Sequence, residues 1–141
     1  MHLIKDELEL AISCFEKAIS FNPKFTDAYI NLAIVQQKKG NFKEAILSLS
    51  QANKLPPKDE LIYLNLGNAF LSLGKTSQAL LAFKKAISFN PLSAEAYCNL
   101  GMTYREMRRY HIAVDCFEKA ITANPLWEDP YIFLGSIYQQ Q

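Results

Sequence analysis

The chain has 141 residues, of which 50% are hydrophobic and 21% are charged, a composition typical of a folded protein that excludes a disordered one. Fifteen lysines and arginines against fourteen acidic residues leave a net charge of +1, which gives no basic surplus for binding nucleic acid. The longest apolar runs, such as residues 79–83, are much shorter than a membrane span, and charges interrupt the N-terminal segment too early for a secretory signal. We therefore expect a cytoplasmic or nuclear protein without nucleic-acid or membrane partners.

A repeat of 34 residues runs through the chain and organises every predicted element. Proline recurs at this step, without an insertion or deletion, at Pro23, Pro57, Pro91 and Pro125. Further columns in the same phase are Ala11, Ala45, Ala79 and Ala113; Phe15, Leu49, Phe83 and Phe117; Ala18, Ala52, Ala86 and Ala120; and Tyr29, Tyr63, Tyr97 and Tyr131. A period of this length indicates a solenoid of repeated supersecondary units.

The first predicted element is a helix over residues 6–21. It carries Ala11, Phe15 and Ala18, which mark the second helix of every later unit, so no first helix precedes it in the sequence. Full units follow over residues 26–59, 60–93 and 94–127.

Each full unit has the pattern of two antiparallel helices joined by a short turn. In the middle unit, the spacing i, i+3, i+4, i+7 of one helix face is occupied by Tyr63, Leu66, Gly67 and Phe70. Gly74 ends this helix. The face of the second helix is formed by Ala79, Phe83, Ala86 and Ile87. Pro91 ends the second helix, and we expect the small Gly67 and Ala79 to lie where the two helices cross.

The last predicted element, over residues 128–141, is a first helix without a second one. Four of its side chains have no second helix to pack on: Tyr131, Leu134, Ile137 and Tyr138. Two interpretations stay open: the chain is a piece of a longer array, or two copies share their incomplete ends.

The repeated unit reads Y-x-x-L-G-x-x-F/Y, then A-x-x-x-F-x-x-A, then N-P, and it resembles the tetratricopeptide repeat over essentially the whole chain. The segments AEAYCNLG (94–101) and DAYINLA (27–33) look most similar to the repeats that precede the catalytic domain of O-linked N-acetylglucosamine transferases. Departures are local: Gln36 replaces an aromatic residue, Leu49 replaces the phenylalanine, and Arg108 occupies a turn position where glycine is common.

The resemblance implies an all-α fold, a right-handed superhelical solenoid of antiparallel helix hairpins that forms one domain over residues 1–141. Residues 1–25 would be the second helix of an incomplete repeat, and residues 128–141 the first helix of another.

No catalytic or metal-binding pattern is present in the sequence, and we expect neither enzymatic activity nor a cofactor. His2 and His111 do not recur with the repeat, and we interpret both as solvent-exposed helix residues. The three cysteines, Cys14, Cys98 and Cys116, are an odd number at no metal-ligand spacing, which favours reduced thiols over a disulfide framework.

The resemblance implies that the first helices line a concave surface. Helical geometry then predicts a peptide-binding site with an apolar floor and a polar rim, formed by Asp27, Ile30, Asn31, Leu64, Asn65, Asn68, Glu95, Cys98, Asn99 and Met102. Ile132 continues this floor. The asparagines in phase, Asn31, Asn65 and Asn99, either hold the main chain of a bound peptide, as the resemblance implies, or bond neighbouring helices to each other; both roles can hold at once.

Another use of the fold that this chain resembles is the two-carboxylate clamp, in which lysine, arginine and asparagine side chains hold the acidic C-terminal tail of a heat-shock chaperone. This mode of binding is disfavoured here. Its cation positions are occupied by Leu64, Asp129 and Phe133 in one register, and Glu95 would repel a carboxylate. We therefore predict a non-catalytic scaffold that binds a neutral or modestly basic peptide, or an amphipathic helix, of another protein. The alternatives are the substrate-recognition segment of a larger enzyme, such as a glycosyltransferase, and a self-assembling structural solenoid.

Overall fold

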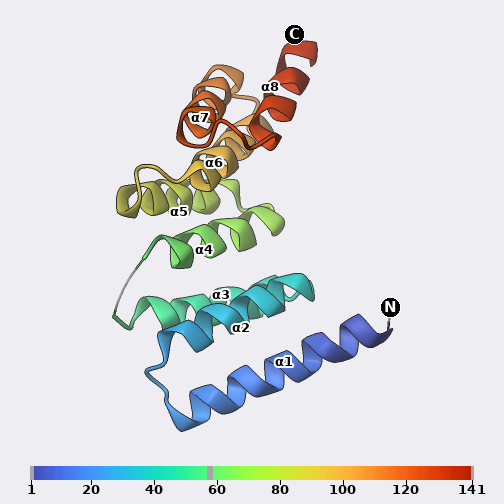
Figure 1. The fold of residues 1–141 in the computed structure, drawn as a ribbon, viewed down its shortest axis with the longest axis vertical. Coiled ribbons are helices and arrows are strands. Elements are labelled where there is room, and N and C mark those ends of the chain that lie inside the picture. Colours follow the sequence, from blue (N-terminus) through green and yellow to red (C-terminus); the bar gives the residue numbers. More distant parts are fainter. Residues whose placement is uncertain (1, 57–58, 141) are drawn as a thin grey trace.

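The computed structural model describes residues 2–56 and 59–140, with side chains from residue 6 onward, so the side chain of His2 and the whole of Pro57 lie outside the described residues. Within these ranges the chain forms α-helices and no strand (Figure 1). In chain order the helices are α1 (His2–Phe21), α2 (Thr26–Lys38), α3 (Phe42–Asn53), α4 (Glu60–Ser72), α5 (Thr76–Phe89), α6 (Ala94–Glu106), α7 (Tyr110–Ala123) and α8 (Asp129–Gln140).

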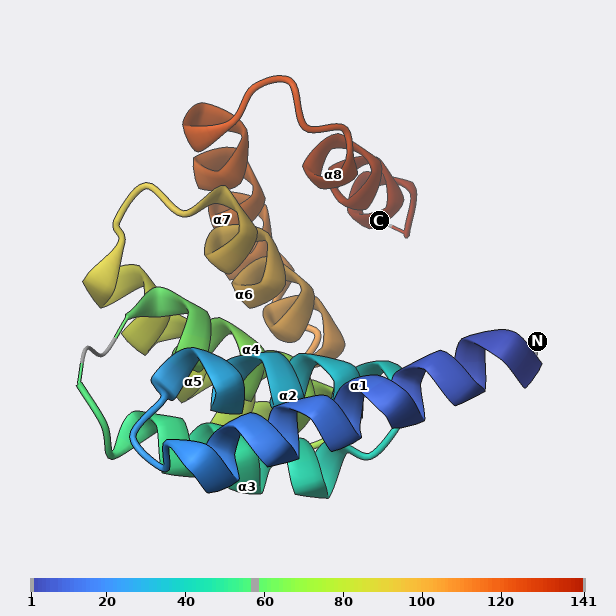
Figure 2. The same ribbon diagram turned by 60° about the horizontal axis from the view of Figure 1, so that its bottom comes forward.

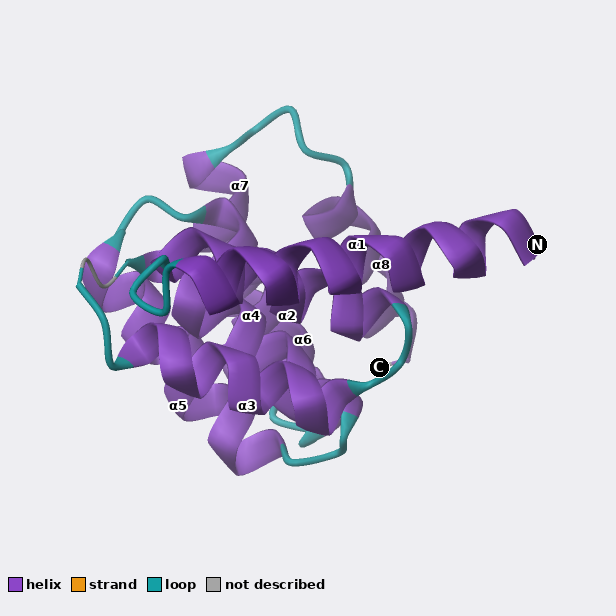
Figure 3. Cartoon of the chain, turned by 90° about the horizontal axis from the view of Figure 1, so that it is seen from below, coloured by secondary structure: helices purple, strands orange, loops and turns teal. Residues whose placement is uncertain are grey.

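The helices are arranged as a stack of hairpins, which confirms the predicted all-α fold class. α2 packs on α3, α4 on α5 and α6 on α7, and each hairpin also contacts the next one. α1 and α8 lie at opposite ends of the stack (Figure 1). α1 is the longest helix of the described chain, and its N-terminal turns project beyond α2 and α3 (Figures 2 and 3).

The turns inside the hairpins share a left-handed residue at one position of the repeat. This residue is Gly40 (φ 88°) after α2 and Gly74 (φ 75°) after α4, as predicted for the end of that helix. The corresponding residue after α6 is Arg108, which adopts φ 60° although it carries a side chain. Glycine reaches this conformation without a steric penalty, whereas other L-residues pay one, so the third hairpin turn is strained.

In the α4–α5 and α6–α7 hairpins, the first and second helices approach closely because glycine faces an aromatic ring. The fully buried ring of Phe83 on α5 lies against Gly67 on α4, and the fully buried ring of Phe117 on α7 lies against Gly101 on α6. The predicted helix crossing at Gly67 is therefore confirmed. Any side chain at these glycines would push the two helices apart.

The main core extends from α4 to α8 and contains the large side chains of Phe83, Phe117 and Ile137. Ile137 is fully buried, so the expectation that it lacks a packing partner is wrong. It belongs to the face of α8 that is turned toward the preceding hairpin, and α8 contacts both α6 and α7. Among the described residues, no helix is both long and apolar enough to cross a membrane.

Candidate protein-binding surface

The first helices of the repeats, α2, α4, α6 and α8, contact one another in sequence and form the surface that we call the first-helix surface. A hydrogen bond joins each neighbouring pair. Gln37 Nε2 of α2 donates to the main-chain oxygen of Asn65 on α4 at 2.8 Å. Asn99 Nδ2 of α6 donates to Asn68 Oδ1 of α4 at 3.0 Å. Arg105 Nη1 of α6 donates to Ser136 Oγ of α8 at 3.3 Å.

The predicted apolar floor is not accessible at three positions, which corrects the expectation for Ile30, Leu64 and Cys98. Their exposed fractions are only 6%, 3% and 1%. The reason is the next repeat: Ile30 of α2 packs against Ile62 of α4, and Leu64 and Cys98 are likewise part of the main core. Ile132 occupies the same column on α8, the last first helix among the described residues, and it is 63% exposed.

The rim of the surface is exposed and acidic. Asp27, Glu95 and Asp129 occupy one column of the repeat and are all exposed, while the fourth member, Leu61, is 49% exposed. Among the described residues, Lys39 forms an ion pair with Glu9, and none of these acids takes part in one. Uncompensated carboxylates of one sign attract a basic group and repel an acidic one.

The field of these acids reaches the buried thiol of Cys98. Burial is the main reason that the pKa of this thiol is raised to about 12, and the negative charges of Asp129 and Glu95 raise the pKa further. The guanidinium of Arg105 acts in the opposite direction. Cys98 is therefore a buried core residue whose protonated form is favoured over the nucleophilic thiolate.

The three asparagines in phase differ in their surroundings. Asn99 bonds the neighbouring helix, through Asn68. Asn65 Nδ2 instead donates to the main-chain oxygen of Leu61 in its own helix at 2.8 Å. Asn31 is exposed, and among the described residues its side chain has no hydrogen-bond partner. The role of tying helices together thus applies to Asn99, while the amide of Asn31 is available to a ligand.

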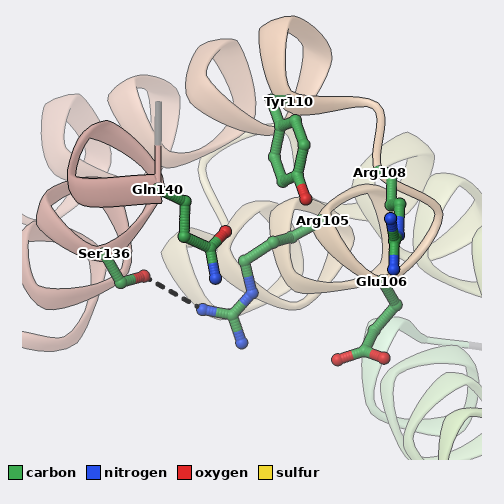
Figure 4. A pocket seen from close by; sticks show the side chains of 6 residues that line it. All are labelled: Arg105, Glu106, Arg108, Tyr110, Ser136 and Gln140. Atoms are coloured by element: carbon green, nitrogen blue, oxygen red, sulfur yellow. Dashed lines mark hydrogen bonds between the residues drawn. The ribbon is translucent and has the colours of Figure 1, made fainter.

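An open hollow of about 600 Å³ lies at the C-terminal end of α6 and α8, and its lining residues are Arg105, Glu106, Arg108, Tyr110, Ser136 and Gln140. Figure 4 shows the guanidinium of Arg105 directed at Ser136, with Gln140 beside it and the carboxylate of Glu106 directed away. The Arg105 guanidinium also lies 5.0 Å from the centre of the Phe133 ring. The two contacts hold Arg105 in place at the edge of the hollow.

Sequence reasoning missed Tyr110 and Gln140. These two residues belong to the start of a second helix and the end of a first helix, which are distant in the repeat pattern and meet only in the folded chain. Three arginines within five residues, Arg105, Arg108 and Arg109, were a charge signal that could have indicated the hollow.

Among the described residues, no group of three or more histidine, cysteine, aspartate or glutamate side chains could hold a metal ion. His111, at the start of α7, is exposed as predicted.

Comparison with known proteins identifies the repeated unit. Family models described as "Tetratricopeptide repeat" match residues 1–25, 14–46 and 94–125, and one described as "TPR repeat" matches residues 37–74 and 67–107. No curated protein matches the chain.

Several solved structures share the fold. A crystal structure of MamA is 26% identical with a TM-score of 0.87, and the match covers 97% of this chain and 80% of MamA. YrrB, described as a TPR protein with an unusual peptide-binding site, is 23% identical with a TM-score of 0.77, over 96% of this chain and 70% of YrrB. The first TPR of Spaghetti (RPAP3), bound to the HSP90 peptide SRMEEVD, is 19% identical with a TM-score of 0.78, over 82% of this chain and 91% of that domain.

Proposed function

Since the chain belongs to the tetratricopeptide repeat family, we propose that it is a non-catalytic scaffold that binds an extended peptide or a helix of another protein along the first-helix surface. The peptide-bound RPAP3 domain and the peptide-binding site named for YrrB support this class of function, because both proteins share the fold. These two proteins are only 23% and 19% identical to the chain, so the nature of its ligand is inferred from its own residues.

The observation that carries the proposal is the exposed acidic rim. Asp27, Glu95 and Asp129 lie at the same position of three of the four first helices, so their spacing follows the stack of first helices rather than one local turn. A ligand laid across the helices meets the carboxylate of Asp27, the apolar Leu61 and then the two further carboxylates. We therefore propose a ligand that is neutral or basic.

The amide of Asn31 and the half-buried amide of Asn65 supply polar contacts beside this rim. An asparagine side chain both donates and accepts, which matches the main chain of an extended peptide. Asn99 Nδ2 already donates one N–H to Asn68, so its amide oxygen and its second N–H are the groups available to a ligand. In this proposal the asparagines form hydrogen bonds with the main chain of the ligand, and the acids favour a ligand that is neutral or basic.

The hollow at Arg105 offers a different environment at the end of the same surface. Two arginines line it, and the carboxylate of Glu106 lies to one side. We propose that it accepts a single polar side chain of the ligand, so that the ligand has a preferred direction on the surface.

The test is selection from a library of displayed peptides against the chain, followed by affinity measurement of the selected peptides. The expected sequences are neutral or basic. The variant Asp27→Lys with Glu95→Lys should weaken their binding at least about tenfold. Glu118→Lys is the matched control, because Glu118 is exposed on the second helix α7, and it should leave binding unchanged. Enrichment of acidic peptides, or equal binding by the rim variant, would refute the proposal.

A further inference from the structure

The two end helices expose apolar side chains that their counterparts in the hairpins cover. On α8, Tyr131 is 50% exposed, Ile132 63% and Tyr138 57%. On α1, Phe21 is 84% exposed. α8 has the pattern of a first helix and α1 that of a second helix, so each end exposes the face on which the other type of helix packs within a hairpin.

The exposed face of α8 contains an open socket at Gly135. Gly135 continues the column of Gly67 and Gly101, against which the rings of Phe83 and Phe117 lie. A Cβ atom added to Gly135 would have no neighbour within 4 Å, and the glycine itself is exposed. The position that receives an aromatic ring in the α4–α5 and α6–α7 hairpins has no side chain against it on α8.

The ring that fits this socket is present on α1. Phe15 is in the same column as Phe83 and Phe117 and is flanked by Ala11 and Ala18, as Phe83 is flanked by Ala79 and Ala86. Phe83 and its two alanines are fully buried, whereas Phe15, Ala11 and Ala18 are all partly exposed. The face of α1 that matches α8 is therefore incompletely covered.

A second pair of residues matches independently of the socket. In the middle hairpin, Tyr63 stacks on Phe89 with a ring-centre distance of 5.4 Å. The residues in the same columns are Tyr131 on α8 and Phe21 on α1, and both are exposed.

A charge match involves the same tyrosine. In the last hairpin, Lys119 Nζ lies 5.8 Å from the centre of the Tyr97 ring. The corresponding residues are Lys17 on α1 and Tyr131 on α8. A helix carrying Lys17 and Phe21 would thus bring both side chains to Tyr131.

From these matches we propose that α1 of a second copy of this chain docks on α8 and completes a hairpin, with Phe15 over Gly135 and Phe21 against Tyr131. Because α1 and α8 lie at opposite ends of the stack, the contact is head to tail and each added copy leaves a new free end (Figure 1). The next copy's α2 would then follow α8 as α4 follows α2, and it would cover the exposed Ile132. The first-helix surface would continue from copy to copy.

The proposal is tested by measuring the mass of the full chain in solution, by sedimentation or light scattering over a range of concentrations. We expect the average mass to rise with concentration. Gly135→Leu fills the socket without a clash inside the chain and should abolish association. Phe15→Ala with Phe21→Ala removes the matching rings and should abolish it as well. Leu81→Ala is the control, since Leu81 is 68% exposed on α5 away from both ends, and it should associate like the unmodified chain.

Mixing the two blocked variants gives the decisive measurement. The Gly135→Leu chain keeps a functional α1 and the double phenylalanine variant keeps a functional α8, so an equal mixture should form a heterodimer while each variant alone is a monomer. Circular dichroism of each variant verifies that it is folded. A monomeric unmodified chain up to about 1 mM, or a mixture that stays monomeric, would overturn the proposal and leave α8 to a helix of another protein.

Discussion

The ring of Phe83 lies so close to Gly67 that a methyl group on this glycine would be 2.6 Å from the Cδ1 atom and 2.7 Å from the Cζ atom of the ring. Phe83 is fully buried in the main core, where neighbouring side chains enclose its ring. This contact sets the distance between α4 and α5.

Gly67→Ala is therefore expected to lower the free energy of unfolding by about 1–3 kcal/mol, because the added methyl group overpacks the helix crossing. Gly135→Ala is the matched control in the same column. With no neighbour within 4 Å, it should raise the free energy of unfolding by up to about 1 kcal/mol, because alanine favours a helix more than glycine does. Urea denaturation at low protein concentration measures both, and equal effects of the two substitutions would contradict this assignment.

Arg108→Gly is expected to stabilise the protein by about 1 kcal/mol, because the left-handed backbone at φ 60° strains an arginine and not a glycine. Gly74→Ala makes the reverse change at the corresponding turn, where φ is 75°, and should destabilise the protein by a similar amount. Thermal unfolding of the two variants measures this. A loss of stability in Arg108→Gly would show that contacts of the arginine side chain outweigh the backbone strain.

Alkaline pH is expected to destabilise the fold through two cysteines. Burial is the main reason that the pKa is raised from 9.0 to about 12 for Cys98 and to about 11 for Cys116. Above pH 9 the thiols of the unfolded chain ionise while those of the folded chain stay protonated, so the unfolded state binds fewer protons. The contribution of these thiols is complete below pH 9 and is lost as the pH rises toward 11–12.

Urea denaturation at about pH 8 and about pH 10.5 measures this decline. The variant Cys98→Ala with Cys116→Ala should show a shallower decline than the unmodified chain. Cys14→Ala should show the same decline as the unmodified chain, because Cys14 is exposed. An unchanged decline in the double variant would assign the alkaline effect to other groups.

The hydrogen bond between Asn99 and Asn68 is expected to contribute about 1 kcal/mol to stability, since it joins α6 to α4 in a partly buried environment. A double-mutant cycle with Asn99→Ala and Asn68→Ala isolates this coupling. Asn31→Ala, at the exposed member of the column, should leave stability almost unchanged. A cycle without coupling would leave peptide binding as the remaining explanation for Asn99.

Much of the fold could be predicted from the sequence, because each hairpin is specified by contacts inside one 34-residue unit. The glycine that receives a ring, the ring itself and the glycine of the turn are close in sequence, and their periodic recurrence makes them visible. Even the substitution of glycine by Arg108 at a turn was apparent from the register, and the structure places this residue in the left-handed region.

The candidate surface was less predictable, because it depends on contacts between units. The repeat pattern predicts that Ile30, Leu64 and Cys98 lie on the same side of their helices. It does not indicate how closely the next first helix approaches them. In the folded chain all three side chains are buried, with Ile30 beside Ile62 of the next first helix, which leaves the acids and amides beside them as the accessible groups.

The sequence by itself determined the repeat, the helix pairing within each unit and the residue types at the helix crossings, since these follow from local periodicity. Only the tertiary structure decided which members of each column reach solvent: Ile132 and Gly135 are exposed on α8, whereas Cys98 and Gly101 in the same columns are buried. The physical reason is that burial in a solenoid is supplied by the neighbouring unit, so identical positions differ wherever the described chain provides no neighbouring helix to cover them.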